Sequence, residues 1–144
     1  MALHIITADE RLSTKPKVNV AVFAPSGWGK TYQARTLDPD TTLFIDLEAG
    51  TLALNGSAED GSDAWRGSTV NVREEAAKIG VHPWEFARGL VCLLGGADPA
   101  AAPGSPYSAD ALAAYEAGIA PMSVFAAYKT IFFDSITVAS RLAF

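Results

Sequence analysis

The sequence predicts an α/β fold of three layers, in which helices cover both faces of a mainly parallel sheet. Short apolar runs typical of strands alternate with stretches of helical spacing, which is the order of βαβ units. The run at residues 42–47 (TLFIDL) is apolar almost throughout, as expected for a strand covered on both faces. A chain of 144 residues, 49% of them hydrophobic, is long enough for one core and one domain.

The first half of the chain predicts two strands joined by a short helix. A β-branched and aromatic run at residues 18–23 (VNVAVF) is followed at once by proline and glycine, which predicts a buried strand. A helix is expected at residues 30–37, and the turn signal at 38–40 (DPD) ends it before the strand at 42–47. Residues 49–68 collect Gly, Ser, Asn and Asp and predict a long mobile loop.

The middle of the chain predicts a short strand at residues 69–72 and a helix at 74–79. A stronger helix is predicted at 83–94, with Pro83 in its first turn. Its apolar face is expected to hold Trp84, Ala87, Val91 and Leu94. Residues 95–106 (GGADPAAAPGSP) are too rich in glycine and proline for a regular element and predict a linker.

The last elements are a helix and a strand. Ser108 is a suitable N-cap for a helix at residues 109–119, which Pro121 closes. The run at 130–134 (TIFFD) predicts the final strand. In a parallel sheet, ligands bind in the crevice at the carboxyl ends of the strands, so the sequence features at those ends are the candidates for function.

Composition excludes several classes of function. The net charge of −5 argues against a chain that grips nucleic acid over its whole surface. A single cysteine, Cys92, permits no internal disulfide and no cysteine-based zinc site, and it is expected in the core. The chain shows no signal peptide at its start and no apolar run of the roughly 20 residues that a membrane helix needs. We therefore expect a cytoplasmic protein without membrane contact.

Histidines and the basic residues near the start carry little functional signal. His4 and His82 stand alone, without partners at metal-ligand spacing, and predict structural roles. Arg11, Lys15 and Lys17 form a small basic cluster that is typical of a solvated segment.

The strongest motif follows the first predicted strand. It fits the pattern G-x-x-x-x-G-K-[ST], with alanine in the first position, and consists of Ala24, Pro25, Ser26, Gly27, Trp28, Gly29, Lys30 and Thr31. The two later glycines allow backbone N–H groups to converge on a phosphate. Lys30 is expected to reach the β- and γ-phosphates, and the Thr31 hydroxyl is expected on Mg²⁺. This phosphate loop, with Tyr32 directly behind it, predicts a nucleotide site.

Two residues of the loop depart from the usual pattern. Ala24 replaces a glycine, and its methyl group is the smallest possible addition. The bulky Trp28 stands beside Gly29 and must point away from the phosphates. It could cover the nucleotide, meet a neighbouring subunit or lie on the surface.

Carboxylates follow two of the predicted strands. Asp134 ends the last strand, where it could hold a Mg²⁺-bound water opposite Thr31; the alternative is that Asp134 or Ser135 caps a helix. Asp46 and Glu48 leave the strand at 42–47 two residues apart, so both are expected on the same side. Either could orient or deprotonate an attacking water, or be merely solvated.

Three segments in order, FAPSGWGKT, LFIDLEAG and TIFFDSITVAS, resemble the core of RecA-type ATPases, including phage-encoded RecA-like recombination ATPases. The resemblance covers residues 17–144 and implies a P-loop ATPase domain there, preceded by an N-terminal segment at 1–16. It implies ATP and Mg²⁺ as ligands, Glu48 and Lys30 as catalytic residues, and Asp134 with Ser135 as the second motif. It also implies a core that continues past residue 144, with single-stranded DNA as a partner of the full-length protein and a possible homo-oligomer.

The resemblance favours a Mg²⁺-dependent ATPase in phage or bacterial DNA recombination or annealing, located in the host cytoplasm if phage-encoded. The second hypothesis is a small-molecule kinase for nucleotides or nucleosides. Such kinases usually supply arginines from a lid, and the long segments at 49–68 and 95–107 contain only Arg66. The third hypothesis is a nucleotide-binding module that no longer hydrolyses.

Overall fold

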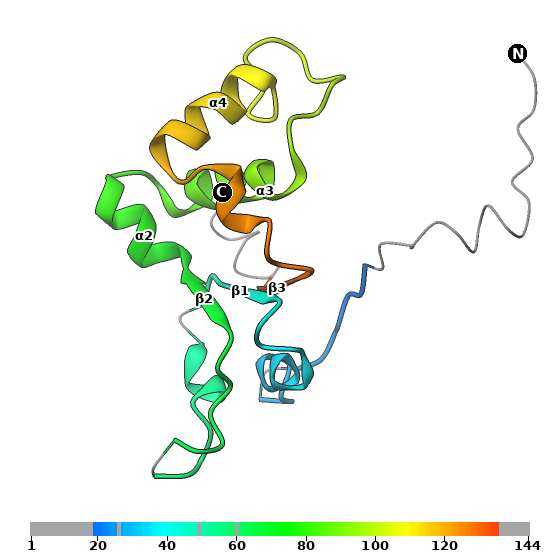
Figure 1. The fold of residues 1–144 in the computed structure, drawn as a ribbon, viewed down its shortest axis with the longest axis vertical. Helices are drawn as coiled ribbons and strands as arrows, with labels where there is room; N and C mark the ends of the chain where they lie inside the picture. Colours follow the sequence, from blue (N-terminus) through cyan, green and yellow to red (C-terminus); the bar gives the residue numbers. More distant parts are fainter. Residues whose placement is uncertain (1–18, 26, 49, 60, 136–144) are drawn as a thin grey trace, which may run out of the picture.

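Three parallel strands form a sheet at the centre of the fold, in the order β2-β1-β3. The computed structural model describes residues 19–25, 27–48, 50–59 and 61–135. In chain order, the elements of the described residues are η1 (Thr31–Thr36), β1 (Thr42–Asp46), η2 (Thr51–Leu54), β2 (Ser68–Asn71), α2 (Val72–Ile79), α3 (Pro83–Gly95), α4 (Ala109–Gly118), η3 (Met122–Phe125) and β3 (Thr130–Asp134), where η marks a 3-10 helix. Figure 1 shows this order along the chain.

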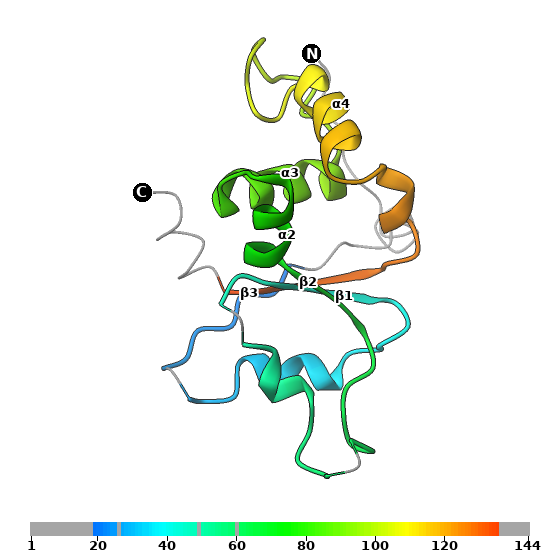
Figure 2. The same cartoon turned by 90° about the vertical axis from the view of Figure 1, so that its left-hand side faces the viewer.

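Helical elements lie on both sides of the sheet, which confirms the predicted α/β fold of three layers. Figure 2 shows α2, α3 and α4 on one side of the strands and the two 3-10 helices η1 and η2 on the other. All five residues of β1 are buried, because this central strand is covered on both faces. The sheet therefore has one face toward α2 and α3 and another toward η1, and we call these the α3 face and the η1 face.

Alternating side chains of β1 supply a separate apolar cluster on each face of the sheet. Leu43 and Ile45 belong to the cluster on the α3 face, together with Val72 of α2 and Leu90 of α3. Phe44 points to the η1 face, where it packs with Ala34 and Leu54. The Phe44 ring also stacks on Phe132 of β3 at 5.2 Å between centroids, an arrangement that contributes about 0.5–1.5 kcal/mol beyond burial.

The predicted strand at residues 18–23 is wrong for the residues that the structure describes. Residues 19–25 form no strand, and the side chains of Val20 and Phe23 are 79% and 90% exposed. Figure 1 shows this segment leading outward from η1. An apolar, β-branched composition favours a strand only where the backbone finds a pairing partner, and composition does not supply one.

Two further boundaries differ from the prediction. The helix expected at 30–37 is a 3-10 helix of six residues, Thr31–Thr36. The strand expected at 69–72 lies one residue earlier, because the Asn71 side chain accepts hydrogen bonds from the N–H groups of Arg73 and Glu74 and so begins α2 at Val72.

Helix α3 forms where it was predicted. Of its expected apolar face, Ala87 is buried in the core cluster and Trp84 and Leu94 pack against that cluster. Phe86, Leu90 and Leu93 are buried, whereas Val91 is 45% exposed. Cys92 in the same helix is also buried, which confirms the prediction that it is a core residue. None of the described helices is long and apolar enough to cross a bilayer.

Side-chain caps begin α3 and α4. His82 Nδ1 accepts a hydrogen bond from Trp84 N at 3.2 Å, which gives this histidine the structural role that was predicted. Ser108 Oγ accepts from Ala111 N at 3.3 Å, so the predicted N-cap of α4 is confirmed. The segment at 97–106 between the two helices contains turns and no regular element, as its composition predicts.

The predicted loop at 49–68 is more ordered than its composition suggests, since it contains η2 and a network of bonds to Asp63. The Asp63 carboxylate accepts hydrogen bonds from the N–H groups of Ser57 and Ala58, both at 2.9 Å. These bonds, more than the guanidinium of Arg35 at 3.6 Å, lower the pKa of Asp63 to about 2. Arg35 belongs to η1 and also donates to the Asp63 carbonyl oxygen, so the loop holds η1.

Replacing Asp63 by asparagine is expected to lower the melting temperature at neutral pH, because an amide accepts these hydrogen bonds less strongly than a carboxylate. The pKa of Asp63 is lower in the folded chain than its ordinary value, so its contribution is present above about pH 4 and is lost as the pH falls toward about 2. Thermal unfolding of both proteins across this range measures the difference.

Glu59→Gln, a charge change at an exposed position of the same loop, is the matched control for Asp63→Asn. It is expected to leave the melting temperature nearly unchanged. A gap between parent and Asp63→Asn that stays constant down to about pH 2 would contradict this role of the Asp63 charge.

Candidate functional site

The glycine-rich loop before η1 has the backbone geometry that its motif predicts. Gly27 and Gly29 adopt φ angles of +81° and +76°, which L side chains rarely adopt. A Cβ at Gly27 would meet no atom within 4 Å, so backbone conformation and not space is the reason for glycine there. Trp28 N donates to the Pro25 carbonyl oxygen at 3.4 Å and closes the turn. Ser26 lies outside the described residues.

Lys30 lies over the loop from which it projects. Its Nζ donates to the carbonyl oxygens of Ala24 at 2.8 Å and of Pro25 at 2.9 Å. These are the first residues of the motif, so the side chain spans the whole loop. The ammonium group is thus held at the mouth of the loop, where a flexible side chain can exchange carbonyl oxygens for phosphate oxygens.

The loop is joined to the end of β3 by one hydrogen bond between residues far apart in sequence. The Thr31 hydroxyl donates to Asp134 Oδ2. Thr31 begins η1 and Asp134 ends β3, so the contact connects the two motifs that the sequence predicts to act together. The structure therefore brings the predicted Mg²⁺-binding residues side by side.

Asp134 is buried among other acidic groups. Its side chain is 3% exposed, and burial is the main reason why its pKa is raised above the ordinary value. The hydrogen bond from Thr31 opposes this shift, whereas the neighbouring Glu48 and Asp46 add to it. The carboxylates of Asp134, Asp46 and Glu48 thus lie near one another at the carboxyl ends of β1 and β3.

Asp46 and Glu48, which were expected on the same side, both lie near enough to Asp134 to raise its pKa but differ in burial. Asp46 is fully buried at the end of β1, directly opposite Asp134 in the sheet register. Glu48 is exposed, because it follows the last paired residue and the chain turns there. The strand rule of alternating sides applies to Asp46 but no longer to Glu48.

Glu48 is linked to β3 through its side chain. The Ser135 hydroxyl donates to Glu48 Oε1, which draws this exposed carboxylate to the residue directly after Asp134. Gly50 passes close to Asp134, since a Cβ on Gly50 would lie 3.8 Å from Asp134 Oδ2. The alternative role of Asp134 and Ser135 as helix caps concerns residues 136–144, which lie outside the described residues.

Two aromatic residues in and directly behind the loop, Trp28 and Tyr32, are exposed. Trp28 is 74% exposed, which agrees with each of its three predicted placements: over the nucleotide, against a neighbouring subunit or on the surface. Tyr32 is 55% exposed, with the Arg35 guanidinium 4.7 Å from its ring centroid. The Arg35 guanidinium that stacks on Tyr32 thus belongs to η1, the helix that follows the phosphate loop.

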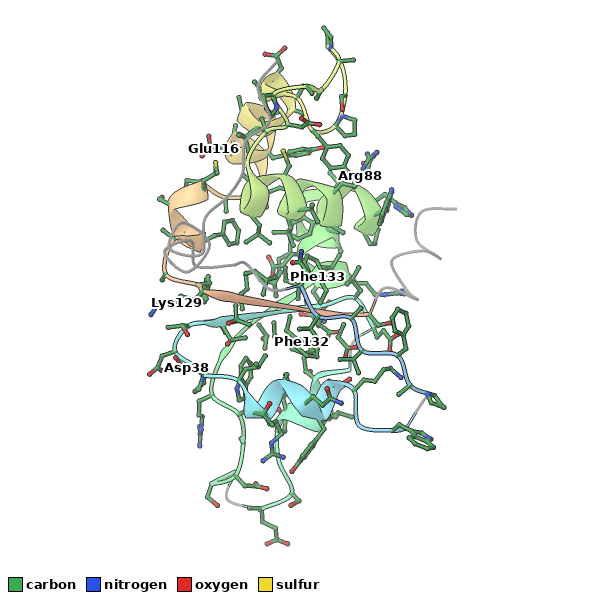
Figure 3. All side chains as sticks on the ribbon, turned by 90° about the vertical axis from the view of Figure 1, so that its right-hand side faces the viewer. Asp38, Arg88, Glu116, Lys129, Phe132 and Phe133 are labelled. Atoms are coloured by element: carbon green, nitrogen blue, oxygen red, sulfur yellow. The ribbon has the colours of Figure 1, made fainter. Side chains whose placement is uncertain are left out.

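A separate apolar hollow of about 220 Å³ lies on the α3 face of the sheet. Its lining includes Phe133, which points to the side opposite Phe132, as Figure 3 shows. Trp84 and Val91, which were predicted to face the core, also line it. Because Asp134 shares the η1 face with Phe132, the hollow is not part of the site at the phosphate loop.

The donor atoms at the loop suit a hard cation. Thr31 and Asp134 offer only oxygen atoms, the donors that such a cation prefers. Within the described ranges, no group of three or more His, Cys, Asp or Glu side chains is arranged to hold a metal by itself. The oxygen donors of Thr31 and Asp134 fit Mg²⁺, which takes few protein ligands and keeps water and phosphate oxygens around it.

The contacts of Asp46, Gly50 and Arg73 in this site were not predicted from the sequence. Asp46 Oδ1 accepts from Glu48 N and Gly50 N, and Arg73 Nε donates to the Leu47 carbonyl oxygen at 3.2 Å. A sequence signal existed for the first of these, because an aspartate followed shortly by glycine at a strand end is typical of a side chain that bonds the next backbone N–H groups. No local signal pointed to Arg73.

Comparison with known proteins agrees with this geometry. No curated protein and no solved structure matches the chain. One family profile, described as AAA domain, matches residues 16–144 and so covers most of the sequence. With its phosphate loop, its parallel sheet and the carboxylate at the end of β3, the chain belongs to the AAA domain family of nucleotide-binding P-loop ATPases.

Proposed function

We propose that this chain binds ATP at residues 24–32 and hydrolyses it in a Mg²⁺-dependent reaction, as one RecA-like domain over residues 17–144. The contact between Thr31 and Asp134 carries the proposal, since it joins the phosphate loop to the strand-end carboxylate. The family match supports a nucleotide-binding ATPase in general. The biological role that we propose, DNA recombination or single-strand annealing in a phage or bacterium, is supported by the resemblance of the three motifs to RecA-type ATPases.

Within the proposed site, Lys30 binds the phosphates and Thr31 with Asp134 holds the metal. Lys30 replaces its bonds to the loop carbonyl oxygens by bonds to the β- and γ-phosphates. The Thr31 hydroxyl and the Asp134 carboxylate would hold Mg²⁺ at this site. When bound, Mg²⁺ neutralises charge that develops on the phosphate oxygens.

Glu48 is the proposed general base. It is exposed to solvent, so water reaches it, and its bond from Ser135 holds it beside the end of β3. From there its carboxylate can orient the attacking water and accept its proton. The buried Asp46 has no such access to solvent and is therefore the poorer candidate for this step.

Lys30→Ala is expected to weaken ATP binding by about 10- to 100-fold, the effect of losing hydrogen bonds from a charged group. The fold should remain, because the partners of Lys30 are carbonyl groups of its own loop. ATP titration together with circular dichroism measures both properties. Lys129→Ala is the control, since Lys129 is exposed at the far end of β3, where Figure 3 shows it. Equal ATP affinity of Lys30→Ala and parent would refute the phosphate-loop assignment.

Asp134→Asn and Thr31→Ala are each expected to raise the Mg²⁺ concentration needed for half-maximal ATP binding by about 10- to 100-fold. Each change removes an oxygen group that is proposed to hold the Mg²⁺ ion. ATP titrations at several Mg²⁺ concentrations measure the effect, with Asp38→Asn at an exposed turn as the control. An unchanged Mg²⁺ requirement in Asp134→Asn would show that Asp134 has only a structural role.

Glu48→Gln is expected to slow ATP hydrolysis by about 10²- to 10⁴-fold while ATP affinity stays the same, because the amide keeps the shape of the side chain but is not a base. Turnover is measured with and without single-stranded DNA and with nucleoside acceptors, which also tests the DNA role and the kinase alternative. Glu59→Gln, an exposed glutamate in another loop, should leave turnover unchanged. Full turnover in Glu48→Gln would remove this residue from the mechanism.

A further inference from the structure

We propose that Asp46 is a positioning residue of this site, which acts on the reaction only by holding the backbone that carries Glu48. The inference rests on the proposed function, since it concerns the placement of the proposed general base. It gives a role to a fully buried carboxylate that the mechanism above leaves without one.

The first observation is the pair of bonds that Asp46 accepts. Its Oδ1 receives N–H groups from Glu48 at 3.0 Å and from Gly50 at 3.2 Å. Both donors lie beyond the last strand pair, where the ladder no longer fixes the backbone. A charged acceptor makes stronger hydrogen bonds than a neutral one, so one side chain defines the path of the chain out of β1.

The second observation is that Asp46 itself has no freedom to move. Its side chain is 0% exposed and its strand is paired on both sides, with Asn71 in β2 and Asp134 in β3. The chain beyond it is also tied to the sheet, because Leu47 N donates to the Asp134 carbonyl oxygen at 2.7 Å. Because Asp46 is fixed in the sheet, its hydrogen bonds can fix the position of the exposed Glu48 relative to the sheet.

The third observation is that packing alone does not explain an aspartate here. Asp46 Oδ2 is buried without a hydrogen-bond partner, and burying an unpartnered carboxylate oxygen is unfavourable. Asp46 also lies near enough to Asp134 to raise the pKa of that group, so the two carboxylates repel each other. An apolar residue would avoid both effects but could not accept the two N–H groups.

Two variants distinguish the contribution of the Asp46 hydrogen-bond acceptor from that of its charge: Asp46→Ala removes both, and Asp46→Asn removes only the charge. The alanine variant removes the acceptor, so turnover should fall about 10- to 100-fold with an ATP KM within about twofold of the parent, the expected effect of a misplaced catalytic group. The asparagine side chain keeps an oxygen in the Oδ1 position and should restore turnover to within about threefold. In a Glu48→Gln background, Asp46→Ala should cause no further loss, because its effect passes through Glu48.

Amide hydrogen exchange tests the positioning without any need for turnover. The N–H groups of Glu48 and Gly50 should be protected in the parent and in Asp46→Asn, and should exchange at least about tenfold faster in Asp46→Ala. The N–H of Leu47, which donates to Asp134, is the internal control and should not change. If Asp46→Ala does not fold, protection in the parent and in Asp46→Asn still decides the question.

The outcomes distinguish this inference from the proposed function. Unprotected Glu48 and Gly50 amides in the parent, or protection that survives Asp46→Ala, would overturn the positioning role. An additive loss in the double variant would also overturn it, since Asp46 would then act by a route other than Glu48. A parent without ATP turnover would instead refute the proposed function, while the exchange data would still show whether Asp46 holds Glu48.

Discussion

The parallel pairing of β1 with β3 is the constraint on which the site depends. Its register places Phe44 beside Phe132 and, two residues later, Asp46 beside Asp134. Because side chains alternate along a strand, all four lie on the η1 face. The stacked rings fill the apolar part of that face, and the carboxylates occupy its end. The same pairing that builds the core thus delivers the acidic groups to the loop that carries Thr31.

The site combines stabilising and destabilising contacts within a small volume. Burial and the charges of Glu48 and Asp46 disfavour the ionised form of Asp134. The Thr31 hydroxyl favours that form, as does, to a smaller extent, the charge of Lys30. Such a concentration of negative charge is unfavourable for folding but suits a centre that binds a cation. The two apolar clusters that enclose β1 stabilise the fold and offset this unfavourable charge.

The two faces of the sheet serve different purposes. The η1 face carries the phosphate loop and the carboxylates, and Arg35 and Trp65 hold η1 against the loop that precedes β2. Trp65 Nε1 donates to the Leu37 carbonyl oxygen at 3.1 Å, and its ring meets Phe44 edge to face. The α3 face carries most of the core and the apolar hollow near Phe133. The residues proposed to bind nucleotide therefore depend on 3-10 helices and turns, and not on the longer helices.

Local sequence patterns correctly predicted the fully buried strand and the features that depend only on neighbouring residues. The apolar run of β1, the caps of α3 and α4 and the positive φ of Gly27 and Gly29 all follow from the residues themselves. The motif also predicted which residues would meet, since Thr31 and Asp134 do lie together. The strand, the caps and the glycine conformations depend on residues close in sequence. The contact between Thr31 and Asp134 joins distant residues, but the two motifs together already predict it.

By itself, then, the sequence determined the α/β class, the phosphate loop and the candidate residues at the ends of the strands. Only the tertiary structure decided whether residues 19–23 pair, that Val91 of α3 is left exposed, and how Asp46 differs from Glu48 in burial. The physical reason is common to all three. A strand needs a partner, a helix face needs a neighbour, and a carboxylate becomes buried or exposed according to where strand pairing ends, and none of these is encoded in a residue's nearest neighbours.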